Sequence, residues 1–181
     1  DVYKGVVWYS KGVINNGSHF IDLLRYLLGE SNRIRVINSG RRWNNKDPEP
    51  DFLITFGKTE IVFLATKEEC YSMADFELIG TKGKIRYGSG GNIIEYLSCK
   101  KDPIFPGYTI LSDKPTMVDS DFNRVQWHVL QNLAEYIGGK TTTIASSGET
   151  TLETLKVLEK INLCNIKIQL LTFMSVKPPS S

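Results

Sequence analysis

Apolar residues in the first hundred positions recur with the two-residue period of β-strands, broken by short glycine-rich turns. Residues 2–10 and 33–43 predict two strands, and 44–50 predicts a polar, proline-containing loop. Five further strands are expected at 51–56, 60–66, 74–79, 84–87 and 92–98, joined largely by glycine turns typical of hairpins. This pattern predicts an antiparallel meander with one buried face, the other being partly polar or covered by a partner.

Three stretches show a helical pattern instead. A turn over 15–18 leads into a helix that ends at Gly29, a left-handed cap. A second helix is expected over 121–137, after a proline-rich loop at 102–116 with one extended piece. A capping box at 146–149 predicts the start of a third helix, while 164–173 fits either more helix or a strand. The expected buried stripes are Phe20, Leu23, Leu24, Leu27 and Leu28 in the first helix, Phe122, Val125, Val129, Leu133, Tyr136 and Ile137 in the second, and Leu152, Leu155, Leu158 and Ile161 in the third.

Composition narrows the function classes. The 181 residues, 41% hydrophobic and 23% charged, suit one α+β domain over 1–175 with a flexible tail at 176–181. A net charge of +2 and dispersed basic residues argue against nucleic acid as a partner. No apolar run is long enough to span a membrane. Three cysteines without a CxxC pair favour a reducing, cytoplasmic location over a disulfide framework or zinc site. The start without Met, directly in a strand, indicates a fragment of a longer chain.

His19 is the first candidate for chemistry because it falls in the expected first turn of the first helix. The positive end of a helix disfavours a second positive charge, which favours a neutral imidazole that can accept a proton from a hydroxyl. The alternative is a histidine that only hydrogen-bonds the turn. His19 and His128 form no close pair and no HExxH motif, so no metal site is expected. The glycines at 80–83 and 88–91 have the spacing of β-turns, and no dinucleotide fingerprint or GxSxG elbow is present.

Three motifs in order give the chain a resemblance to the C-terminal domain of the Gfo/Idh/MocA oxidoreductases, the glucose–fructose oxidoreductase and inositol dehydrogenase family. The first motif comprises Gly12, Asn15, Gly17, His19, Asp22 and Leu28-Gly29. The second comprises Glu77, Gly80, Thr81 and Gly83, and the third Gly139-Lys140 with Ser147-Gly148-Glu149. The resemblance covers roughly residues 6–161.

The resemblance implies an open, mostly antiparallel sheet with helices packed on one face. It implies a longer enzyme whose N-terminal Rossmann domain binds NAD or NADP and supplies a catalytic lysine, so this fragment alone is expected to bind no cofactor and to be inactive. His19 would act as the acid/base at the oxidised hydroxyl of a sugar, polyol or sugar nucleotide, with Lys11 and Asn16 at the substrate. The open sheet face would form a homo-oligomer.

Asn15 departs from the family pattern, which has Asp at this position. An amide cannot take a proton, although it can still hydrogen-bond a sugar hydroxyl. Lysine and His19 could suffice for catalysis, which is the reading that we favour. The substrate could differ from simple polyols, or the protein could be a non-catalytic binding and dimerisation module of the same family.

Overall fold

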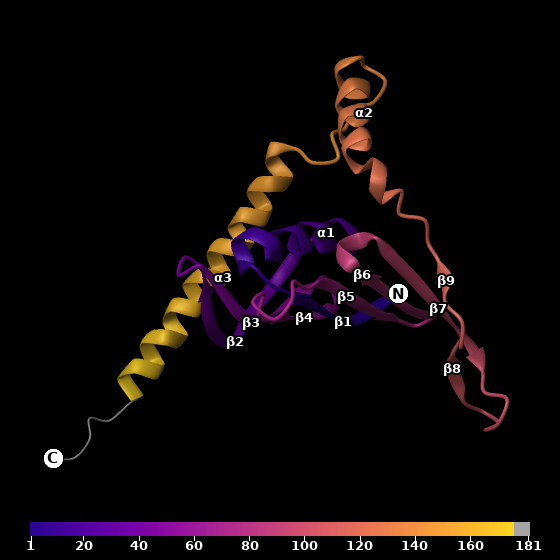
Figure 1. Ribbon diagram of the computed structural model, residues 1–181, viewed down its shortest axis with the longest axis horizontal. Coiled ribbons are helices and arrows are strands. Elements are labelled where there is room, and N and C mark those ends of the chain that lie inside the picture. Colours follow the sequence, from indigo (N-terminus) through magenta and orange to yellow (C-terminus); the bar gives the residue numbers. More distant parts are fainter. Residues whose placement is uncertain (176–181) are drawn as a thin grey trace.

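A nine-stranded sheet forms the body of the protein (Figure 1). The structure is a computed structural model that describes the backbone of residues 1–175 and the side chains of residues 1–171, so the predicted tail at 176–181 lies outside it. Eight strands run in the order β2-β3-β4-β1-β5-β6-β7-β8, and β9 pairs with β7. Their bounds are Val2–Tyr9 (β1), Ser31–Trp43 (β2), Asp47–Phe56 (β3), Thr59–Ala65 (β4), Ala74–Gly80 (β5), Gly83–Gly88 (β6), Ile93–Lys101 (β7), Thr109–Leu111 (β8) and Thr116–Met117 (β9).

The predicted α+β class with a mostly antiparallel sheet is confirmed, but the continuous meander is wrong. β1 lies between β4 and β5, antiparallel to β5 and parallel to β4. Val6 and Val7 of β1 sit opposite Val62 and Phe63 of β4. A central strand buried on one face and flanked by two partners protects more apolar surface than an edge strand would.

The predicted loop at 44–50 is also wrong, because only Asn44 to Lys46 form a turn. Asp47 to Pro50 begin β3, where Asp47, Pro48 and Glu49 pair with Trp43, Arg42 and Arg41 of β2. A residue that precedes proline is restricted to extended backbone. The Asp-Pro-Glu-Pro segment is therefore compatible with a strand near the sheet edge, although its composition resembles a loop.

Two helices cover one face of the sheet, α1 (Ser18–Leu28) and α3 (Gly148–Ser175). The buried residues of α1 are Phe20, Ile21, Leu24 and Arg25, so the predicted stripe is displaced: Leu27 is 51% exposed. On α3, Leu158 and Ile161 are buried as predicted, whereas Leu152 and Leu155 are exposed, and Thr154 and Val157 take the inner positions. The stretch 164–173, left open by the sequence, continues as helix.

Helix α2 (Val125–Ile137), preceded by the 3₁₀ turn η3 (Phe122–Arg124), stands away from the sheet (Figure 1). None of its residues is buried, and the whole predicted stripe is exposed, with Leu133 at 43% and Ile137 at 76%. Trp127 and His128 of the same helix are exposed as well. The periodicity correctly located this helix, but its apolar face has no cover within residues 1–171.

Within the described part of the chain, no helix combines the length and hydropathy of a membrane-spanning segment.

Candidate functional site

The candidate site lies on one continuous helical segment that follows β1. Residues Gly12–Gly17 form a short π-helix, η1, which runs directly into α1. The predicted turn at 15–18 is therefore helical. His19 is in the first turn of α1 as expected, but η1 precedes it, so it does not lie at a free helix end. π-helical turns are rare and frequently occur at functional sites, because they re-aim side chains.

His19 projects between two hollows. One, of about 290 Å³, lies between α1 and the start of α3 and is lined by Ile14, Ser18, His19, Asp22, Ser146, Thr151, Thr154, Leu155 and Leu158. The other, of about 220 Å³, lies toward the sheet and is lined by Asn16, His19, Phe20, Leu23, Ala74, Tyr87 and Gly90. The exposed imidazole can therefore reach a polar molecule placed in either hollow.

The structure brings only some of the predicted site residues together. Asn16 shares the sheet-side hollow with His19. Asn15, exposed one helical turn before His19, lines neither hollow. Lys11 lies at the beginning of η1 and its ammonium pairs with Glu68 at 3.6 Å; it lines neither hollow.

The start of η1 is held by carboxylates from β3. Asp47 accepts the backbone N–H groups of Ile14 at 3.0 Å and Asn15 at 2.9 Å. Glu49, only 2% exposed, accepts the N–H of Gly12 at 3.2 Å and a bond from Arg41 Nε at 2.7 Å. Sequence reasoning missed both residues, although two acidic residues two positions apart, each before a proline, place their side chains on one face of an extended strand.

Because of these carboxylates, the start of η1 is not a dinucleotide-binding site. A helix that follows a strand can bind phosphate through its free first-turn N–H groups. Here those donors already bind two acidic side chains, which would repel a phosphate. The described residues therefore do not fit NAD or NADP at this position.

The other end of α1 is anchored to α3 by a buried arginine that sequence reasoning also missed. The Arg25 side chain is 4% exposed and makes two bonds to Glu30, at 2.9 and 2.7 Å. Its Nη1 donates to Thr150 O and Thr154 Oγ1, both at 2.8 Å. Thr154 in turn donates to Asp22 at 2.7 Å, so Asp22 also braces α1 against α3.

The predicted capping box begins one residue later than expected. Ser147, not Ser146, accepts the N–H of Thr150 at 3.3 Å. The Ser147 hydroxyl also bonds to Glu149 and lowers the pKa of that carboxyl. This cap begins α3 so that Ser146, Thr151 and Thr154 face His19 across the larger hollow. Within residues 1–171, no three His, Cys, Asp or Glu side chains gather closely enough to hold a metal ion.

Comparison with solved structures relates this geometry to known proteins. The WlbA dehydrogenase from Bordetella pertussis, solved in complex with NADH and UDP-GlcNAcA, superposes with a TM-score of 0.65 at 15% identity, covering 92% of this chain and 55% of that one. UDP-N-acetylglucosamine 3-dehydrogenase GnnA from Acidithiobacillus ferrooxidans gives 0.62 at 11%, covering 90% and 54%. An oxidoreductase from Sinorhizobium meliloti gives 0.65 at 10%, covering 92% and 55%. The fold is that of one part of these oxidoreductases.

The resemblance drawn from the sequence motifs is thereby confirmed at the level of fold. The chain spans little more than half the length of the solved structures that it matches. No protein-family model matches the sequence. No curated protein matches it either.

Proposed function

We propose that this chain is the substrate-binding domain of an NAD(P)-dependent oxidoreductase of the Gfo/Idh/MocA family that acts on a sugar, polyol or sugar nucleotide. The observation that carries the proposal is the position of His19, exposed between two hollows in a fold shared with sugar-nucleotide dehydrogenases. Two WlbA structures with this fold were solved in complex with NADH and UDP-GlcNAcA, which makes a UDP-sugar the first substrate to test.

In this proposal His19 accepts the proton of the substrate hydroxyl as the alcohol is oxidised to a carbonyl. Ser146 and Thr151 offer hydroxyls opposite the imidazole, and Asn16 offers an amide in the second hollow, so each can orient a polyol by hydrogen bonds. Asn15 can bind a hydroxyl but cannot take its proton. Lys11 contacts substrate only if its pair with Glu68 opens.

The cofactor is assigned to a second domain of a longer protein. The first-turn donors of η1 are occupied, and this chain corresponds to only part of each similar structure. The uncovered helix α2 supports such a domain. Its apolar side chains span about 200° of the helix surface, an arc that solvent-facing helices rarely show. This fragment alone is then expected to be inactive.

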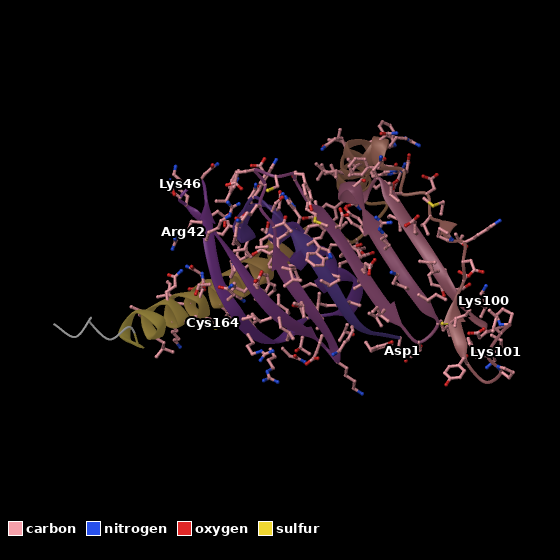
Figure 2. The ribbon with its side chains drawn as sticks, turned by 60° about the horizontal axis from the view of Figure 1, so that its bottom comes forward. Asp1, Arg42, Lys46, Lys100, Lys101 and Cys164 are labelled. Carbon is pink, nitrogen blue, oxygen red and sulfur yellow. The ribbon has the colours of Figure 1, made fainter. Side chains whose placement is uncertain are left out.

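The sheet face opposite α1 and α3 is proposed as a homo-oligomer contact. That face is uncovered (Figures 1 and 2) and carries the half-buried Val6, Trp8 and Val62 at its centre. Val62→Glu should convert the oligomer to a monomer in sedimentation experiments, whereas Leu27→Glu on the helix side should not. A wild-type monomer would refute this contact.

Three free cysteines are compatible with the proposed cytoplasmic location.

The deciding experiment measures NAD(P)H formation by the longer protein with UDP-GlcNAcA and related sugars. His19→Ala should lower kcat by about 10²-fold or more, while His128→Ala, the other histidine, should leave it unchanged. Equal effects of the two substitutions would remove His19 from the mechanism. No turnover with any sugar would favour the non-catalytic module, and Asn15, in place of the family's Asp, would then indicate the loss of catalysis.

A further inference from the structure

We infer that Asp47 is a positioning residue: its carboxylate, held on β3, fixes the helical segment that presents Asn15 and His19. The inference adds a residue to the proposed function, and its kinetic test rests on that function. It starts from a feature outside both hollows, the bidentate acceptance of two consecutive N–H groups by one side chain, at 3.0 Å from Ile14 and 2.9 Å from Asn15.

The bonds satisfy donors that would otherwise be free. A helix leaves its first four N–H groups without an internal partner. In η1, Asp47 and Glu49 together accept three such N–H groups, from Gly12, Ile14 and Asn15. Negative charge at this end is also favoured by the helix dipole. The segment is therefore docked on β3 by charged acceptors, beyond what apolar packing provides.

The approach of Asp47 is close enough to dictate the sequence of the helix. A Cβ placed on Gly12 would lie 2.1 Å from the Asp47 carboxyl carbon, and Gly12 has a φ of +86°. Only glycine allows the carboxylate to reach the N–H groups beyond it. On β2, Gly40 allows a close approach of a different kind, between backbones, because a Cβ there would lie 1.9 Å from the Glu49 backbone carbonyl oxygen.

The geometry explains how a residue outside the hollows acts on His19. η1 and α1 form one continuous segment that is fixed at two points, by Asp47 and Glu49 at its start and by Arg25 near its end. Asn15 and His19 lie between these points. With the first anchor removed, the π-helical turn can rotate or rewind, and the imidazole leaves its position between the two hollows.

Asp51 provides a matched control. It lies on the same strand and its carboxylate also accepts a backbone N–H, but that of Ala65 at 2.9 Å, whereas the η1 donors bind Asp47 and Glu49. Asp47→Ala and Asp51→Ala therefore remove the same charge and the same kind of bond. Asp47→Asn keeps one oxygen acceptor and should give an intermediate effect, and it serves as the second variant if Asp47→Ala fails to fold.

The first arm uses NMR on this chain and needs no activity. Asp47→Ala should shift the amide protons of Ile14 and Asn15 and the ring protons of His19, whereas Asp51→Ala should leave all of them in place. Unchanged His19 ring signals in Asp47→Ala overturn the inference, whatever the enzyme does.

The second arm uses the longer protein with a UDP-sugar. Asp47→Ala should lower kcat at least about ten-fold with little change in the KM for the cofactor, since a small displacement of a reacting group is costly. Asp47→Asn should recover part of that loss. A kcat loss equal to that of Asp51→Ala overturns the inference. Absence of turnover by the wild type is instead a failure of the proposed function, and the NMR arm then decides alone.

Discussion

Replacing Arg25 by methionine tests whether the polar anchor between α1 and α3 stabilises the fold. The guanidinium lies at 4% exposure and donates four hydrogen bonds, two to Glu30 and one each to Thr150 O and Thr154 Oγ1. Methionine keeps most of the apolar stem and removes all four donors. The change therefore isolates the polar contribution from the packing of the side chain.

The magnitude follows from which partners can recover. Glu30 is 68% exposed, so its carboxylate returns to water and its two bonds are discounted. The bond to the buried Thr154 hydroxyl and the bond to the Thr150 carbonyl are charge-assisted and shielded from water, where each is worth about 1.5–3 kcal/mol. Relief of the desolvated charge offsets part of this sum. We expect Arg25→Met to lower the free energy of unfolding by about 2–3 kcal/mol.

The assay is urea unfolding and thermal melting of this chain followed by circular dichroism. For a protein of this size the loss corresponds to a decrease in Tm of about 4–12 °C. Arg86→Met is the control, since Arg86 is 51% exposed and pairs with Glu95 at 3.3 Å; it should cost less than about 1 kcal/mol. Equal losses in the two variants would refute the reasoning that burial makes the Arg25 bonds strong.

Three further outcomes are expected. Burial, with Asp51, Glu49 and Asp47 nearby, raises the pKa of Tyr9, so its phenol stays neutral in the folded protein while the unfolded chain ionises above about pH 10. The free energy of unfolding, measured by urea titration, should therefore fall above that pH. Tyr9→Phe should remove this part of the dependence of stability on pH. Gly12→Ala should lower the free energy of unfolding, measured in urea, by about 2 kcal/mol or more. This loss should exceed that of Gly29→Ala, because Gly29 has a similar positive φ but no atom within 4 Å of an added Cβ. Equal losses would refute the clash with Asp47. Leu133→Glu on α2 should change Tm little and reduce binding of a hydrophobic dye, whereas Leu24→Glu in the core should unfold the chain; a large destabilisation by Leu133→Glu would show that α2 is packed.

Much of the fold could be predicted from local pattern. The hairpin at Gly57 and the hairpin at 80–83 have their turns where glycine requires them, and the strands on either side were located within a few residues. The segment 47–50 was missed because proline composition resembles a loop, whereas its strand conformation depends on pairing with Trp43, Arg42 and Arg41 of β2. That partner lies outside any local window.

The candidate site was predicted only in part. His19 and Asn16 were singled out and do line one hollow, since they lie three residues apart on one helix. Asp22 was named as part of the first motif, but its bond with Thr154 appears only in the structure. Asp47, Arg25 and Thr154 were not found, because each acts on a partner that is more than twenty-five residues away in the chain or lies on another element.

The sequence by itself determined most of the strands and helices and where the glycine turns fall, because these depend on side-chain period and on backbone freedom within a few residues. Tertiary structure decided the rest. It inserted β1 parallel to β4, left the apolar stripe of α2 uncovered, and extended the first helix back to Gly12, where carboxylates from β3 satisfy its free N–H groups. Each of these outcomes depends on which distant surface or charged group meets the segment, and local periodicity carries no information about that partner.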